Sequence, residues 1–285
     1  MADRSTPAHH NELGLFLRAR RAATDPGQAG LPGDVGLRRV PGLRREELAH
    51  LAHISFDYVV RLEQGRTRRI SRSVLDSLAD ALQLTPDERD YLFSLADVPT
   101  DTPARAPGRP DVAPQLRGLL DDMHDIPAVV LHRRMDILAW NRAASALLGD
   151  FQALPVPHRN IVRLTFLDDG FRSLYVDWPR VARECVAVLR QEAGHHRDDP
   201  DLTALVTELN DRDPDFRRWW ADYQVAGPRQ LVKRLHHPTA GSLTVDVQQL
   251  SVDTARDQLL ATYTGHDTES RHALRFLLQW AGKRA

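Results

Sequence analysis

The sequence predicts a multidomain chain, in which an all-α N-terminal domain of five helices is joined to an α+β C-terminal domain with a mostly antiparallel sheet. Three observations support this prediction. Apolar residues recur at helical spacing as far as residue 97, a segment with five prolines follows, and strand-like alternation then appears on both sides of several helical stretches. We therefore expect domains at residues 1–97 and 115–285, separated by a solvated linker at residues 98–114.

Apolar stripes locate the helices of the N-terminal domain. They place the first four around residues 13–17, 48–52, 59–62 and 74–82, and Thr85-Pro86 is a typical start for the fifth. A long loop rich in glycine and proline separates the first helix from the second. Connections between packed helices normally have about 2–8 residues, so this loop is expected to be either functional or a solvated insertion.

The third helix has recognisable ends. Ser55 can cap its N-terminus, Gly65 follows its last turn, and arginines come directly after the glycine. Two short helices that meet at such a turn are typical of a helix-turn-helix, whose second helix enters the major groove of DNA. Residues 13–72 also hold twelve arginines against six acidic residues, which suits a face turned to phosphate. The sequence therefore predicts binding to double-stranded DNA.

Helical periodicity separates the two faces of the third helix. Val59 and Leu62 point to the core, and the opposite face is left for a DNA groove. Arg61 can donate two hydrogen bonds to a guanine edge, which discriminates between bases by about 1–3 kcal/mol. The side chains expected to read bases are Ser55, Phe56, Asp57, Arg61 and Gln64.

Basic side chains around this helix are expected to contact phosphates, which position a protein without specifying the DNA sequence. For Tyr58, packing is an equally good interpretation. Glu63 is expected to be structural and to pair with Arg18 or Arg21. The full set of expected phosphate contacts is Arg38, Arg39, Arg44, Arg45, Tyr58, Arg66, Arg68 and Arg69.

Strands and helices alternate in the second half of the chain. Strands are expected at residues 128–132, 136–141, 230–236, 242–250 and 258–265. Helices are expected near residues 116–123, 142–148, 181–189, 202–209, from Pro214 onwards, and at 270–280. Strands at both ends with helices between them predict an α+β domain with an antiparallel sheet.

Composition and motifs argue against several other classes of protein. No apolar run approaches the roughly 20 residues of a membrane span, and the first residues lack the apolar stretch of a signal peptide, so a cytoplasmic protein is expected. Cys185 is the only cysteine and is expected to be an inert core thiol. His195-His196 is expected to belong to a polar loop between helices and His236-His237 to be structural. The sequence has no GxSxG, Gly-rich phosphate-loop or HExxH motif. We expect no enzyme, no metal and no cofactor.

Several motifs resemble a known family. Residues 41–66, PGLRREELAHLAHISFDYVVRLEQGR, resemble the Xre/Cro-like helix-turn-helix regulators, and among them the type described as MmyB-like. The second half carries motifs similar to that family's C-terminal domain, in matching order, at residues 127–131, 136–142, 159–166 and 237–246. The resemblance covers roughly residues 13–281.

This resemblance implies a transcription regulator whose C-terminal domain has a PAS-like fold and a pocket for a small apolar ligand, with fatty acids as the best candidates. All five tryptophans lie in the second half, which is compatible with an apolar pocket, although such residues are more often plain core. The residues expected to line the pocket or to bind a head group are Trp140, Asn141, Arg159, Asn160, Arg163, Phe166, Trp219, His237 and Tyr263.

One recognition helix reads only a few base pairs, so we expect a homodimer on a pseudo-palindromic operator. Two alternatives stay open for the C-terminal domain. It could serve only dimerisation or protein contacts without a small ligand, which a well-packed core would favour. It could also be an enzyme that senses through turnover, which would require a polar cluster with perturbed ionisation in a cleft.

Overall fold

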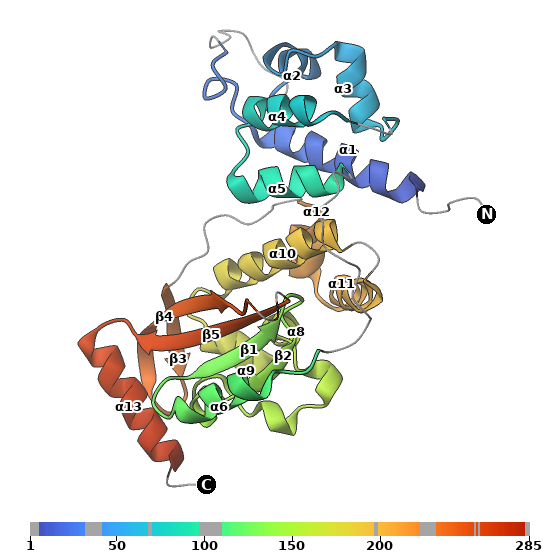
Figure 1. The fold of residues 1–285 in the computed structure, drawn as a ribbon. Coiled ribbons are helices and arrows are strands. Elements are labelled where there is room, and N and C mark those ends of the chain that lie inside the picture. The colour runs from blue at the N-terminus through green and yellow to red at the C-terminus, as the bar shows by residue number, and fades with distance from the viewer. Residues whose placement is uncertain are drawn as a thin grey trace, which may run out of the picture. The chain divides into compact units, whose positions relative to one another are not determined.

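The computed structural model describes residues 6–31, 42–67, 70–96, 110–196, 199–222, 232–253, 255 and 257–282. Contacts divide the chain into two compact units, one built mainly from residues 1–105 and the other mainly from residues 106–285 (Figure 1). Of the predicted linker, residues 98–109 lie outside the described residues. Among the residues that are described, no helix combines the length and the apolar character that crossing a membrane requires.

The described part of the first unit contains the five predicted helices. They are α1 (Thr6–Ala23), α2 (Arg45–Leu51), α3 (Phe56–Glu63), α4 (Arg72–Ala81) and α5 (Pro86–Leu95). Their apolar faces meet in one core, in which Phe16, Leu48, Leu62 and Leu92 are almost completely buried. Phe16 and Tyr91 pack edge to face, with ring centroids 5.1 Å apart, and so join α1 to α5.

Local hydrogen bonds define both ends of α3. The hydroxyl of Ser55 accepts a hydrogen bond from the backbone N–H of Tyr58 at 3.2 Å. At the other end Gly65 adopts a φ of 68°, and the N–H of Arg66 donates to the carbonyl of Arg61 at 2.9 Å. This is a Schellman ending, in which a left-handed residue closes the helix. The cap and the glycine identified in the sequence therefore set the length of α3.

Helix α1 approaches the end of α3 very closely, because Gly14 has no side chain. A Cβ atom at Gly14 would lie 2.4 Å from the carbonyl oxygen of Glu63, well inside van der Waals contact. The same carbonyl accepts a hydrogen bond from Nε of Arg18 at 3.1 Å. The position of α3 is thus held by backbone contact as well as by side chains.

The second unit is built on a five-stranded antiparallel sheet with the strand order β2-β1-β5-β4-β3. Its strands are β1 (Ala128–His132), β2 (Ile137–Trp140), β3 (Val232–His237), β4 (Gly241–Ser251) and β5 (Gln258–Gly265). Val247 lies opposite Tyr263, and Gln249 opposite Ala261, so these four side chains share one face of the sheet. The predicted α+β class and antiparallel sheet are confirmed.

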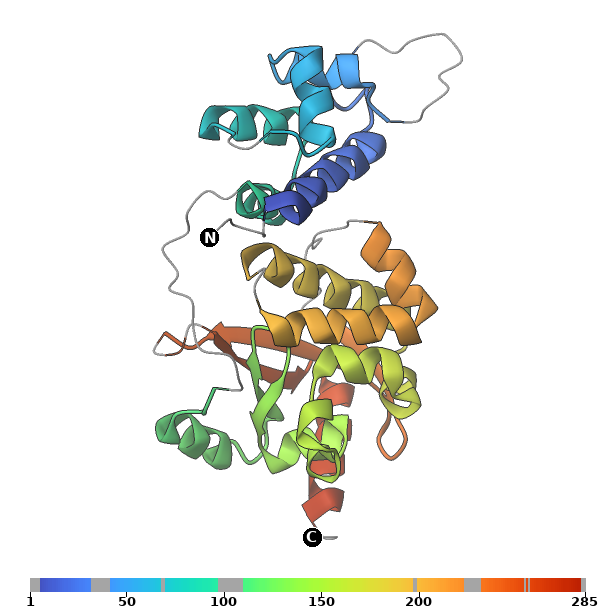
Figure 2. The ribbon, with the colours of Figure 1, turned by 90° about the vertical axis from the view of Figure 1, so that its right-hand side faces the viewer.

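Helices lie on both sides of this sheet. They are α6 (Pro114–Asp122), α7 (Arg142–Leu148), α8 (Ile161–Leu167), α9 (Asp169–Leu174), α10 (Trp178–His195), α11 (Pro200–Arg212), α12 (Pro214–Ala221) and α13 (Thr268–Gly282). In both views α10 lies on one side of the sheet, and α6 and α13 on the other (Figures 1 and 2). Helix α13 packs against β4 and β5. The sheet is therefore covered on two faces, and α10 covers the face that carries Val247 and Tyr263.

Two short helices, α8 and α9, are absent from the sequence prediction. Helix α8 buries five of its seven residues, so it has no polar face and no amphipathic period that a sequence pattern could reveal. The side chain of Asn160 caps α8 by accepting a hydrogen bond from the backbone N–H of Arg163 at 3.0 Å. Burial on most sides, rather than periodicity, accounts for this helix.

Candidate functional site

The face of α3 that points away from the core of the first unit is exposed along the helix, whereas Val59 and Leu62 are buried on the other face. Phe56, a large apolar side chain, is 45% exposed, an arrangement that suits contact with a thymine methyl group. All the side chains expected to read bases lie on this face or at its two ends, and all are exposed: Ser55, Phe56, Asp57, Arg61 and Gln64.

The residues expected at phosphates differ in their surroundings. Arg44 and Arg66 are exposed, one at the start of α2 and one just after α3. Tyr58 is half-buried and packs against the core of the first unit, which favours the packing interpretation. Four further members of the set lie outside the described residues, namely Arg38, Arg39, Arg68 and Arg69.

Glu63 ties α3 to two other helices through a buried carboxylate. Its two oxygens accept hydrogen bonds from the Nε atoms of Arg21 on α1 and Arg45 on α2, each at 2.6 Å. The Glu63 side chain is 1% exposed, so these cations compensate for the burial of its charge. The expected pairing with Arg21 is present. Arg45, expected at a phosphate, has its Nε engaged by Glu63 while its side chain stays 47% exposed.

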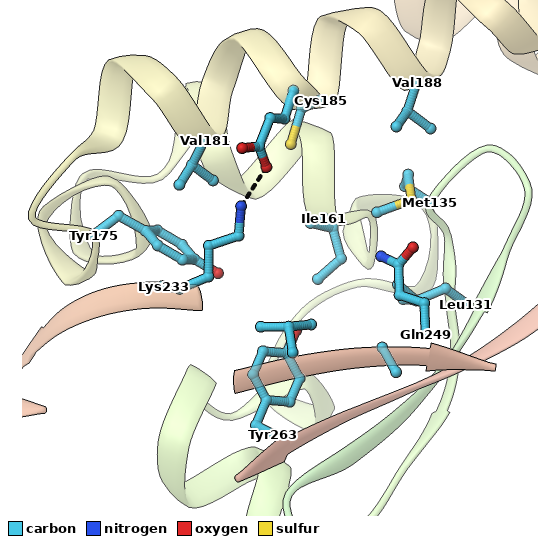
Figure 3. A pocket seen from close by; sticks show the side chains of 13 residues that line it. Leu131, Met135, Ile161, Tyr175, Val181, Cys185, Val188, Lys233, Gln249 and Tyr263 are labelled. Atoms are coloured by element: carbon cyan, nitrogen blue, oxygen red, sulfur yellow. Dashed lines mark hydrogen bonds and ion pairs between the residues drawn. The ribbon is translucent and has the colours of Figure 1, made fainter. Parts of the chain in front are cut away.

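A cavity lies between α10 and the sheet in the second unit (Figure 3). It is partly open and offers about 90 Å³, several times the roughly 10–15 Å³ that a single water molecule requires. Helix α10 contributes Val181, Glu184, Cys185 and Val188, which follow one another at the spacing of a single helical face. The remaining lining residues come from the sheet and from the segments beside it: Leu131, Met135, Ile161, Tyr175, Lys233, Val247, Gln249, Ala261 and Tyr263.

The two ends of this cavity differ in polarity. Lys233 on β3 and Glu184 on α10 form an ion pair between the sheet and the helix that covers it (Figure 3). Tyr175 lies beside this pair, whereas Leu131 and Met135 lie toward the opposite end. The cavity therefore has one charged end and one uncharged end, where the amide of Gln249 lies beside these two apolar side chains.

Two tyrosine hydroxyls also belong to the cavity lining. Tyr175 and Tyr263 are buried, and within the described part of the chain neither hydroxyl has a hydrogen-bond partner. Burial raises the pKa of both phenols, and for Tyr175 the neighbouring Tyr263, Cys185 and Glu184 raise it further. Both groups therefore stay protonated at neutral pH and can donate a hydrogen bond.

Cys185 faces the same cavity from α10. Burial raises the pKa of its thiol to about 11, only partly offset by the hydroxyl of Thr165, whose Oγ1 lies 3.9 Å from Sγ. A thiol with this pKa is protonated at neutral pH and is a poor nucleophile, as the sequence analysis predicts.

Of the nine residues expected to form a ligand pocket, Tyr263 alone lines this cavity. The two asparagines are committed to backbone groups instead. Asn141 donates from Nδ2 to two carbonyls of the loop between α6 and β1, both at 2.7 Å, and caps α7. Asn160 donates to the carbonyl of Arg134 at 2.9 Å and caps α8. These amides hold loops in place.

The arginines of the expected pocket also have local partners. Nε of Arg159 donates to the carbonyl of Leu154 at 3.0 Å, and its guanidinium lies 5.2 Å from the ring centroid of Trp140. Arg163 on α8 forms an ion pair with Glu208 on α11. These contacts join neighbouring helices and loops and do not reach the cavity.

His237, Phe166 and Trp219 also lie apart from the cavity lining. His237 Nδ1 accepts a hydrogen bond from the N–H of Thr239 at 3.1 Å, and Nε2 lies 3.0 Å from a backbone carbonyl, while burial lowers the pKa of this imidazole. Phe166 packs edge to face against Trp178 and Phe216, at 5.8 and 5.1 Å between ring centroids. Trp219 is buried on α12 and does not line the cavity. For Phe166 the plain-core interpretation fits.

Sequence reasoning missed the charged pair that lines one end of the cavity. One signal was available, because Lys233 is one of only two lysines among the 38 lysine and arginine residues of the chain. Lysine carries a compact ammonium, whereas arginine carries a planar guanidinium, so the two are not interchangeable at a confined site. The described residues hold no group of three or more side chains suited to a metal ion.

Comparison with known families finds two matches. Residues 112–277 match the family model described as MmyB-like transcription regulator ligand binding domain, and residues 12–92 match that of a helix-turn-helix domain. The first match covers more than half of the chain and contains every residue that lines the cavity. The second contains α2, α3 and α4. Comparison with curated proteins finds no match.

Proposed function

Because the chain belongs to the family of the MmyB-like transcription regulator ligand binding domain and joins it to a helix-turn-helix domain, we propose that a fatty-acid-like ligand in the cavity beneath α10 controls its affinity for a DNA operator. The coarser role, a ligand-responsive transcription regulator, follows from the two families. Both are regulatory families and neither is enzymatic. A cytoplasmic location belongs to the same proposal.

The DNA half of the proposal rests on the exposed face of α3. Arg61 reads a guanine edge there, and Ser55, Phe56, Asp57 and Gln64 complete the base contacts. The chain binds a pseudo-palindromic operator as a homodimer, because one helix of eight residues reaches too few base pairs for a specific site. Arg44 and Arg66, both exposed, contact phosphates on either side.

The ligand half rests on one observation, the cavity between α10 and the sheet. Its lining is mostly apolar, with a charged pair at one end and the amide of Gln249 toward the other, which is the usual composition of a small-molecule site. The single antiparallel sheet with a helix laid across it is compatible with the PAS-like fold that we propose for this domain. A ligand that binds one conformation of the domain more tightly than another shifts the population toward the first conformation. The resulting change in DNA affinity is limited by the ligand's difference in affinity for the two conformations.

Native mass spectrometry of the purified protein tests the ligand half, followed by denaturation and analysis of the released small molecules. We expect a co-purifying acyl compound, or a rise in melting temperature across a series of fatty acids. Val188→Phe should abolish the shift by filling the cavity, while Val156→Phe, at a surface position that is 51% exposed, should preserve it. A ligand-free dimer whose melting temperature does not change with any fatty acid of the series would favour a dimerisation module instead.

Paired arginine substitutions test the DNA half, on an operator selected from random duplexes. Arg61→Ala should remove the preference for the operator, a loss of about 1–3 kcal/mol, and leave weak salt-sensitive binding to any duplex. Arg66→Ala should weaken both kinds of binding equally and lower the salt slope by about one. Equal losses on operator and random DNA for Arg61→Ala would refute its base-reading role.

A further inference from the structure

We infer that the charged end of the cavity binds the anionic head group of the ligand, and that this head group displaces Glu184 as the ion-pair partner of Lys233. The inference rests on the proposed function, since it assigns a head-group class and a binding residue to the same cavity. An acyl carboxylate is the ligand chemistry that fits both ends. Its tail would extend toward Leu131, Met135 and Val188.

The position of the ion pair makes such an exchange possible. Lys233 belongs to the sheet and Glu184 to the helix laid across it, so the pair joins the floor of the cavity to its cover (Figure 3). The two side chains are 12% and 21% exposed. A charge pair this far out of water is held by its geometry, and a second anion that reaches Lys233 competes with Glu184 directly.

The hydrogen-bond donors around the pair favour an anion over a neutral group. Besides the ammonium of Lys233, the hydroxyls of Tyr175 and Tyr263 belong to the lining and have no partner among the described residues. Both stay protonated, because burial raises the pKa of each phenol. A carboxylate is an acceptor with about four lone-pair sites, so it can accept from all three donors at once.

Glu184 already has a second cation within reach. Arg180, one turn earlier on α10, places its Nε 3.9 Å from Oε1 of Glu184, and its side chain is 51% exposed. When a carboxylate takes Lys233, Glu184 can therefore pair with Arg180 at the solvent edge rather than lie beside a like charge in the cavity. The exchange replaces a tie between α10 and β3 by a pair within α10. Ligand binding thereby removes one tie between the helix and the sheet.

Calorimetry on the full-length protein tests this inference with two probes of equal tail length, dodecanoate and 1-dodecanol. The wild type should prefer dodecanoate. Lys233→Met should weaken dodecanoate roughly 10- to 100-fold and leave dodecanol nearly unchanged, because only the acid has a charge to lose. Glu184→Gln should tighten dodecanoate by removing its competitor, again without effect on dodecanol. Lys233→Arg should restore part of the preference, which a packing role alone would not predict.

The outcomes separate the head-group inference from the proposed function. If Lys233→Met and the wild type bind dodecanoate equally while both probes bind, the inference is overturned and the apolar ligand stands. If neither probe binds the wild type, and octanoate and decanoate also do not bind, the result contradicts both the inference and the fatty-acid proposal. Circular dichroism of each variant checks its fold, and dodecanol binding confirms that the cavity is intact.

Discussion

Two glutamates on two helices form ion pairs of the same kind in different surroundings. Glu63 ends α3 inside a filled core, with an arginine on each carboxylate oxygen. Glu184 on α10 borders a cavity, with Lys233 as its partner and Arg180 within reach. In the first arrangement both carboxylate oxygens are paired, while the second borders free volume and has an alternative cation. We therefore expect the ion pairs of Glu63 to keep their partners, whereas the free volume beside Glu184 allows its ion pair to exchange partners.

The largest expected effect separates these two glutamates. Glu63→Ala should destabilise the first unit by about 3–5 kcal/mol, because Arg21 and Arg45 would keep their charges near a core that no longer compensates them. Glu184→Ala should cost less, since water that enters the cavity can solvate the ammonium of Lys233. Hydrogen exchange measured by mass spectrometry on the full chain reports the two units separately. Similar losses of protection in both variants would contradict the comparison.

A matched pair of valines compares the filled core with the cavity directly. Val59 on α3 is 1% exposed in the core of the first unit, and Val188 on α10 lines the cavity. Val59→Phe should cost about 1–3 kcal/mol through overpacking. Val188→Phe should change stability by less than about 1 kcal/mol, because the added ring has space to occupy. Thermal unfolding followed by circular dichroism measures both changes, and a larger loss for Val188→Phe would show that the cavity cannot accept a side chain.

Helical glycines offer the same contrast on the backbone. Gly14→Ala on α1 should destabilise the first unit by about 1–3 kcal/mol, because its Cβ would collide with the carbonyl of Glu63. Gly118→Ala on α6 meets no atom within 4 Å and should stabilise the second unit by about 0.5–1 kcal/mol. Denaturant titration of the two variants gives both values. A neutral result at Gly14 would mean that α1 and α3 can move apart at little cost.

The smallest effect concerns the reactivity of the single thiol. With a pKa of about 11, Cys185 has only about 0.1% thiolate at pH 8, so a disulfide reagent should modify it far more slowly in the folded protein than in denaturant. Because Cys185 lines the cavity, a bound acyl chain should slow the reaction further. Labelling at the same rate in the folded and denatured chain would place the thiol in solvent and argue against the cavity.

Local chemistry in the sequence predicted much of the fold. Ser55 and Gly65 act through hydrogen bonds within a few residues, so the ends of α3 could be read from the residues themselves. The strands likewise follow from alternation, and β1 and β5 have the predicted bounds. Helix α8 escaped prediction because most of its surface is buried, which removes the amphipathic pattern.

The cavity could not be predicted in the same way. Val181, Cys185 and Val188 repeat at helical spacing, and this pattern is the same whether the facing volume is filled or empty. Whether it is filled depends on how α10 lies over the sheet, which is a property of the whole domain. The aromatic residues that drew attention, such as Phe166 and Trp178, pack against one another instead. Residue types in the sequence indicate which side chains are polar, but they do not indicate whether the space between α10 and the sheet is filled.

The chain between residues 160 and 175 meets the sheet at both of its edges. Asn160 bridges to Asp136 beside β2, and Tyr175 bridges to Leu235 on β3, so one continuous segment reaches from one edge of the sheet to the other. Unpaired edge strands are templates for intermolecular β-pairing and aggregation. At these two points the segment occupies backbone groups of the outer strands, which leaves less of each edge open to another chain.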